Sequence, residues 1–127
     1  MPYATLTRIF TFESAHQLPN HGGKCARLHG HSYRLEVAIR GPLIETAYAS
    51  DEGMVLDLLD LKRIVHEAVI ERLDHQNLNE VIPCRTTVEN IAHWIWRELS
   101  PALGDLLFRL RLWETTTGYV EVMKDDV

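Results

Sequence analysis

The sequence has 127 residues, of which 46% are hydrophobic and 24% are charged, and its formal net charge is -5. These values predict a single globular domain, residues 1–127, that buries roughly two-thirds of its unfolded surface without disulfides or a structural metal. The acidic balance offers no basic field to a nucleic acid or an anionic membrane, and the first residues lack the basic and apolar regions of an export signal, so we expect a cytoplasmic protein with neither partner.

Two extended segments open the predicted fold. Apolar and aromatic residues alternate with threonines from Thr5 to His16, which is typical of a β-strand. After a loop at 19–23, a second alternation centred on residues 33–39 runs to Arg40 and stops at the following glycine and proline. We expect the two strands to pair as a hairpin.

Two helices are expected next. Apolar residues recur at helical spacing from about Leu58 to about Leu73, with charged residues on the other side. Thr86 is followed three residues later by Glu89, which is the pattern of a capping box at the start of a helix. An apolar stripe behind this box predicts a second helix that ends near Ser100.

Two more strands complete the pattern. Apolar residues alternate with arginines over 108–112, and extended character resumes over 119–123 after a threonine-glycine turn. The order ββααββ, without regular βαβ alternation, predicts an α+β fold in which an antiparallel sheet carries both helices on one face.

Three histidines are the main candidates for a metal site. His29 and His31 are two residues apart on the second strand, so both side chains leave the same face of the sheet. His16 has the parity of Phe10 and Phe12 at the end of the first strand, and a hairpin would bring it to the same place. Three imidazoles with a fourth position open form the arrangement that zinc uses in catalysis.

Other interpretations of these histidines remain open. They can be ordinary core or surface residues. The segment from Gly23 through His29 and His31 to Glu36 also fits the opening of the cupin metal motif. Parity argues against a cupin, because Glu36 lies an odd number of residues from both histidines, and two helices do not suit a jelly roll.

The two cysteines differ in their surroundings. Cys25 lies four residues before His29 and is flanked by Lys24 and Arg27, a setting that favours a reactive thiolate. It can act as a base or nucleophile, or it can close the zinc site as a fourth ligand, and the sequence does not separate these roles. Cys84 is expected to be inert.

Two carboxylates are further candidates. Asp74 adjoins His75 after the first helix, where a carboxylate can orient an imidazole, although a polar helix end is the explanation that the residues alone favour. Glu114 shares the parity of the apolar residues at 110 and 112, which places a carboxylate on the apolar face at a strand end. Its partner can be the N–H groups of a ligand or an internal arginine.

Five motifs occur in one order along nearly the whole chain. They are Phe12-Glu13-Ser14-Ala15-His16, Lys24-Cys25-Ala26-Arg27-Leu28-His29-Gly30-His31, Leu73-Asp74-His75-x-x-Leu78-Asn79, Thr87-x-Glu89-Asn90-Ile91-Ala92 and Trp113-Glu114-Thr115. Together they resemble the 6-pyruvoyl-tetrahydropterin synthase family. The spacing of three residues between Cys25 and His29 is similar to that of the bacterial 6-carboxy-5,6,7,8-tetrahydropterin synthases, because the animal pyruvoyl enzymes have a longer gap.

The resemblance implies a tunnelling fold, in which two trimeric barrels stack as a homohexamer with active sites at subunit interfaces. It also implies a role for each residue that matches the family motifs. These are the zinc ligands His16, His29 and His31, the thiol acid/base Cys25, the proton-transfer pair Asp74 and His75, the pterin anchor Glu114, and Thr87, which helps to seat the pterin. Thr86 stands where the family usually has proline, and a helix cap can use either residue.

The implied reaction converts 7,8-dihydroneopterin triphosphate to 6-carboxy-5,6,7,8-tetrahydropterin, acetaldehyde and triphosphate, in queuosine and other 7-deazapurine pathways. Zn2+ would act as a Lewis acid on the side-chain oxygens while Cys25 and His75 move protons. Lys24 and Arg27 are candidates for binding the triphosphate. Three alternatives stay open: triphosphate elimination alone, which gives a pyruvoyl product, a cupin-type oxygenase or isomerase, and a zinc- or pterin-binding module without turnover.

Overall fold

The computed structural model describes residues 2–127, which form the predicted strand and helix order with several short additions. The strands are β1 (Tyr3–His16), β2 (His29–Pro42), β3 (Gln76–Asn77), β4 (Leu107–Thr115) and β5 (Gly118–Met123). The helices are α1 (Leu58–Val65), α2 (Glu71–Leu73), α3 (Leu78–Val81) and α4 (Val88–Leu103). A π-helical segment, His66–Ile70, joins α1 to α2, and short 3-10 turns lie at Lys24–Ala26, Gly104–Leu106 and Lys124–Asp126.

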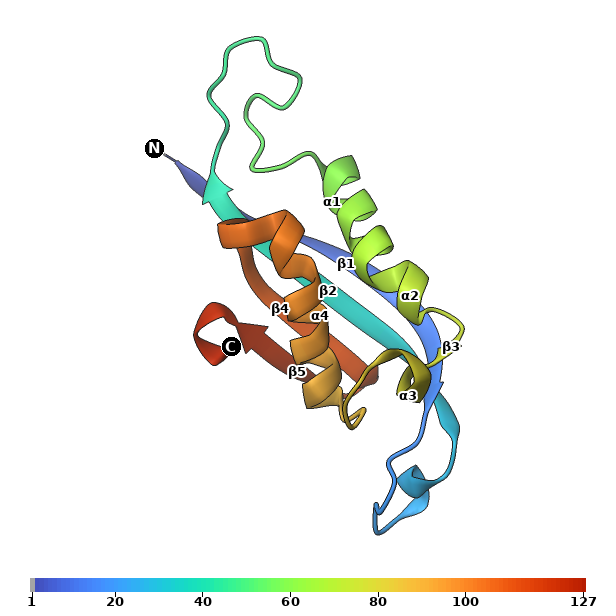
Figure 1. The fold of residues 1–127 in the computed structure, drawn as a ribbon. Helices are drawn as coiled ribbons and strands as arrows, with labels where there is room; N and C mark the ends of the chain where they lie inside the picture. The colour runs from blue at the N-terminus through green and yellow to red at the C-terminus, as the bar shows by residue number, and fades with distance from the viewer. Residues whose placement is uncertain (1) are drawn as a thin grey trace.

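The strands of residues 2–127 form one sheet in the order β3-β1-β2-β4-β5 (Figure 1). The pairs β1–β2, β2–β4 and β4–β5 are antiparallel, which confirms the expected α+β arrangement. The two-residue strand β3 is an addition that lies parallel to β1, opposite Ser14 and Ala15, so the sheet is mixed. Two residues are too few to show a periodicity, so β3 could not be predicted from the sequence.

The first predicted helix is present as one continuous helical stretch from Leu58 to Leu73, although its middle widens to π geometry. Asp57 caps its start by accepting a hydrogen bond from the backbone N–H of Leu59. The stretch ends at Asp74, whose backbone is extended.

The predicted bounds of the second helix were wrong at both ends. Thr87 is the N-cap of α4 and accepts a hydrogen bond from the N–H of Asn90, whereas Thr86 is buried and contacts the end of β1 instead. The helix continues through Pro101 to Leu103 and ends at Gly104, which has a positive φ. Proline near the C-terminus removes one N–H donor and still allows the last turn to form.

The helices cover one face of the sheet, and the hydrophobic core lies between them (Figure 1). Alternate residues of β2 and β4 face this core, including Leu35, Val37 and Leu110, each of which is fully buried. Phe12 and Tyr33 stack there with ring centroids 4.9 Å apart. This parity continues to the ends of β1 and β2, so it also determines which way the histidines point. None of the helices in the described residues is long and apolar enough to cross a membrane.

Candidate metal centre and the surrounding site

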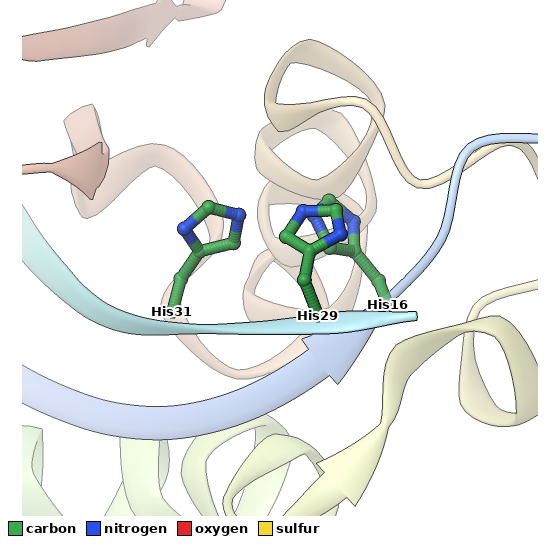
Figure 2. Close-up of side chains that lie close together, drawn as sticks. All are labelled: His16, His29 and His31. Carbon is green, nitrogen blue, oxygen red and sulfur yellow. The ribbon is translucent and has the colours of Figure 1, made fainter. Parts of the chain in front are cut away.

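Three histidines converge where the β1–β2 hairpin opens. His16 ends β1 and pairs in register with His29 at the start of β2, while His31 lies opposite Ser14. Figure 2 shows the three imidazoles on the same side of the sheet. Their ring centroids are 4.6 to 5.1 Å apart, and one nitrogen of each ring lies within 4.8 Å of the other two. This spacing suits a single divalent ion between them.

The hydrogen bonds of the rings leave one nitrogen of each free for such an ion. The Nδ1 atom of His16 lies 2.8 Å from the carbonyl oxygen of Thr86, and that of His29 lies 2.7 Å from the carbonyl oxygen of Arg27. Because a carbonyl only accepts, both Nδ1 atoms carry the proton and a neutral ring keeps its lone pair on Nε2. Among residues 2–127, the buried Nε2 atoms of His16, His29 and His31 have no hydrogen-bond partner.

The charge state of the cluster also favours a metal. Burial lowers the pKa of His16 and of His31 below the usual value of 6.5, and it outweighs the carboxylate of Glu114, which acts in the opposite direction. Neutral imidazole is the form that ligates metals, so protons compete weakly for these two rings at neutral pH. The donor set therefore fits zinc.

Glu114 lies beside the histidines, on the apolar side of β4 as its parity predicts. Its two carboxylate oxygens are 3.6 Å from Nε2 of His16 and 3.8 Å from Nε2 of His31. The hydroxyl of Tyr33 lies 3.5 Å from the same carboxylate, and burial together with this negative charge raises the tyrosine pKa, so the hydroxyl stays protonated and donates. Glu114 also borders a cavity of about 300 Å³ near the N-terminus of α4. A ligand in that cavity can therefore contact the carboxylate, which itself lies beside the histidine cluster.

Cys25 lies in the short turn Lys24–Ala26, on the loop between β1 and β2. It shares a cavity of about 400 Å³ with Lys24, Arg27, Leu28, His29 and His31. Within the described residues, the cluster whose ligand atoms all lie within 4.8 Å of one another contains the three histidines and not this thiol. The thiol thus stands next to the cluster, and both basic side chains border the same cavity.

Asp74 and His75 form the predicted contact at the end of α2. The carboxylate of Asp74 is 3.0 Å from Nδ1 of His75 and accepts a hydrogen bond of 2.9 Å from the backbone N–H of Glu13. The latter bond is the main reason why the pKa of Asp74 is below its usual value. His75 has a positive φ of 58° and an exposed side chain, which borders a cavity of about 520 Å³ at the edge of the sheet.

The Asp74–His75 pair and Cys25 border different cavities within one chain. The cavity beside His75 is lined by residues of β1, β2 and β3, and His31 borders this cavity as well as the one that contains Cys25. A single chain does not bring the thiol and the His75 imidazole into one cavity.

Two other residues depart from the sequence interpretation. The hydroxyl of Thr87 caps α4, so its predicted contact with a pterin would have to share that oxygen. Thr86, which the capping-box pattern placed at the helix start, is buried and holds Nδ1 of His16 with its carbonyl oxygen at 2.8 Å and its hydroxyl oxygen at 3.1 Å. No local pattern reveals this contact, because the two residues are 70 positions apart in the sequence.

The structure contradicts the cupin interpretation. Glu36 lies on the face of β2 opposite His31, and its carboxylate is 3.3 Å from the guanidinium of Arg34. The sheet is covered by helices on one side, whereas a cupin is a sandwich of two sheets. The odd spacing between Glu36 and the two histidines therefore correctly argued against a cupin.

Comparison with known proteins agrees with this arrangement. The family model described as 6-pyruvoyl tetrahydropterin synthase matches residues 5–125. The chain is 42% identical over 110 residues to a 6-carboxy-5,6,7,8-tetrahydropterin synthase of Synechocystis, an alignment that covers 86% of this chain and 84% of the relative. It is 37% identical over 129 residues to a 6-pyruvoyl tetrahydrobiopterin synthase of Dictyostelium discoideum, with 91% and 92% covered.

A solved structure shows the same fold. The 6-pyruvoyl tetrahydropterin synthase of Caenorhabditis elegans superposes with a TM-score of 0.84 at 27% identity, and the match covers 97% of this chain and 96% of that one. The sheet, the helices on one face and the matched length agree with the tunnelling fold that the motifs implied. The chain belongs to the 6-pyruvoyl tetrahydropterin synthase family.

Proposed function

We propose that this chain converts 7,8-dihydroneopterin triphosphate to 6-carboxy-5,6,7,8-tetrahydropterin, acetaldehyde and triphosphate, and that it uses zinc. The observation that carries the proposal is the set of three buried Nε2 atoms, which face one another without partners in the described residues and lie next to a carboxylate and a thiol. Relatives that carry the name of the carboxy enzyme, such as that of Synechocystis, favour this product. We keep a cytoplasmic location as part of the proposal.

His16, His29 and His31 would hold the zinc, which supplies Lewis-acid polarisation of oxygens on the substrate side chain. Glu114 offers two acceptor oxygens in one plane, which suit the paired N–H groups of a pterin edge. Because the carboxylate is negatively charged and lies beside the imidazole rings, it favours a ligand edge that offers two N–H donors. The pterin would therefore lie against β4, with its side chain directed at the histidines.

Cys25 would take or return a proton on the substrate side chain from the cavity that it shares with His29 and His31. Lys24 and Arg27 border this cavity and would face the triphosphate. His75 would handle a second proton, and Asp74 would hold its ring through the contact at 3.0 Å. The carboxylate contact fixes the orientation of the exposed ring, so the other ring nitrogen can face the substrate.

An assembly would bring these groups together. In the described residues, β5 pairs only with β4, and β3 covers β1 only at Ser14 and Ala15, so the outer edge of β5 and most of that of β1 are open for pairing with another chain. We propose the homohexamer of two stacked trimeric barrels, in which the cavity beside His75 meets the Cys25 cavity of a neighbouring chain.

The second candidate is elimination of triphosphate without loss of acetaldehyde, which gives 6-pyruvoyl-tetrahydropterin. The similarity to the Dictyostelium relative, whose name specifies that activity, favours this alternative. The two products require the same zinc, acid–base and pterin groups, so the residues described above support both.

The test is a product assay with purified, zinc-loaded protein and 7,8-dihydroneopterin triphosphate. We expect acetaldehyde and a carboxypterin in equal amounts. A pyruvoyl pterin without acetaldehyde would establish the second candidate, and tight zinc or pterin binding without any product would reject both. The Cys25→Ala variant is expected to keep its zinc and lose turnover, whereas loss of zinc would identify Cys25 as a ligand.

A further inference from the structure

The loop that carries Cys25, residues 17–28, is connected to the start of α4 by Arg85. One guanidinium nitrogen of Arg85 donates a hydrogen bond of 2.7 Å to the carbonyl oxygen of Pro19. Two positions of the chain that are 66 residues apart are joined by this bond. No motif of the sequence assigns a role to Arg85.

A second hydrogen bond links the contact at Pro19 to the residue that carries the thiol. The backbone N–H of Leu18, next to Pro19, donates a hydrogen bond of 2.8 Å to the carbonyl oxygen of Cys25 itself. This bond closes the loop into a ring, so the position of Pro19 and the position of Cys25 are linked. At the start of the loop, Gln17 is joined to Asn79 by two hydrogen bonds of 2.8 and 3.0 Å. Within the described residues, the other hydrogen bonds of positions 18–25 stay inside the loop, so Arg85 supplies the connection between this inner part of the loop and the segment before α4.

Arg85 is itself held in place by α4. The side-chain amide of Asn90, in the first turn of that helix, donates a hydrogen bond of 2.9 Å to the backbone carbonyl of Arg85. Asn90 also donates its backbone N–H to the capping hydroxyl of Thr87. The path from the helix to the thiol thus runs through Asn90, Arg85, Pro19 and Leu18, and each step is a hydrogen bond or a chain neighbour.

We propose that Arg85 is a positioning residue that holds Cys25 at the histidine cluster by fixing the loop of residues 17–28 to α4. A thiol on an untethered loop would sample positions away from His29 and His31, and a proton transfer requires the thiol within hydrogen-bond reach of the substrate. The effect on turnover rests on the proposed function, whereas the effect on the position of the thiol does not.

The thiol itself reports the test. Because Cys84 is exposed and would also react, all variants are made in a Cys84→Ser background, in which iodoacetamide labels Cys25 alone. The variants are Arg85→Met, Arg85→Lys and, as a matched control, Arg97→Met, which removes an exposed arginine from α4. Each is measured for the rate of Cys25 alkylation, for zinc affinity by chelator competition, and for kcat and KM.

We expect Arg85→Met to raise the alkylation rate by about threefold to tenfold, the equivalent of one lost hydrogen bond. It should lower kcat by a similar factor and leave zinc affinity unchanged, because the three histidines lie on β1 and β2 and the carbonyl that holds His29 belongs to Arg27, outside the ring closed between Leu18 and Cys25. Arg85→Lys, which retains a donor, should recover part of both effects, and Arg97→Met should change neither. A rise in alkylation without turnover in the parent protein would support the tether and reject the proposed function.

Two results would overturn the proposal. An alkylation rate that is the same in Arg85→Met and the parent would show that Cys25 does not depend on this tether. A raised KM with unchanged kcat and unchanged alkylation would show that Arg85 binds the triphosphate directly and does not position the thiol.

Discussion

Zinc should stabilise the folded protein, and the histidine cluster allows the size of the effect to be worked out. The three Nε2 atoms are buried without partners in the described residues, so a bound ion adds interactions and breaks none. At a free zinc concentration of 100 times the Kd, the free energy of unfolding rises by about 2.7 kcal/mol. For a chain of this length, that change raises the thermal midpoint by about 10 °C.

The His31→Ala variant tests whether the cluster is responsible. Replacing a residue that only supports a metal ligand lowers metal affinity by about 10- to 100-fold, and we expect the loss of a ligand itself to lower it by at least about 100-fold. At the same zinc concentration the variant would then be only about half saturated. The stabilisation falls to about 0.4 kcal/mol, or roughly 2 °C.

The assay is thermal unfolding followed by circular dichroism, with excess EDTA and with zinc, for the parent, His31→Ala and His93→Ala. His93 lies on α4, outside the metal cluster, and should leave the zinc-induced shift intact. An equal shift in His31→Ala and the parent would refute the reasoning, as would a parent whose midpoint does not respond to zinc.

Three further results are expected. Thr86→Val, which removes the hydroxyl at 3.1 Å from Nδ1 of His16 and keeps the carbonyl, should weaken zinc binding by about threefold to tenfold in chelator competition, and an unchanged Kd would contradict the supporting role. Glu114→Gln should lower kcat/KM by about 10- to 100-fold at unchanged zinc content, since a charged acceptor is lost, and an equal kcat/KM would exclude the carboxylate as the pterin anchor. Asp74 has a folded pKa below 3.8, so its contribution to stability is complete above that value and is lost as pH falls through the folded pKa. Urea unfolding should therefore show a constant gap in the free energy of unfolding between the parent and Asp74→Asn from pH 5 to 7, and this gap should narrow as pH falls through the folded pKa of Asp74, whereas a gap that does not change with pH would contradict the shift.

The part of the site that follows strand periodicity could be predicted from the sequence. Because side chains alternate along a strand, Phe10 and Phe12 indicated the direction of His16, and the same rule placed Glu114 on the apolar side of β4. Hairpin pairing then required His16 and His29 to meet. These statements depend only on a period of two and on which face is buried.

Contacts between distant segments could not be predicted in this way. Thr86 matched a capping box, yet its buried contact with His16 took precedence and the cap passed to Thr87, because a buried ring nitrogen requires a partner. The tether from Arg85 to Pro19 leaves no local pattern, since each residue by itself is ordinary. The separation of Cys25 and His75 between two cavities likewise depends on how the loop and the sheet edge fold, which periodicity does not describe.

X-ray absorption spectroscopy of the protein loaded with one equivalent of zinc addresses the metal site directly. We predict a first shell of three imidazole nitrogens from His16, His29 and His31 at about 2.0–2.1 Å, completed by an oxygen from solvent. The same spectrum should lose one nitrogen scatterer in His31→Ala and stay unchanged in Cys25→Ala. A sulfur scatterer at about 2.3 Å in the resting protein, or a spectrum that does not respond to the loss of His31, would contradict an open three-histidine zinc centre.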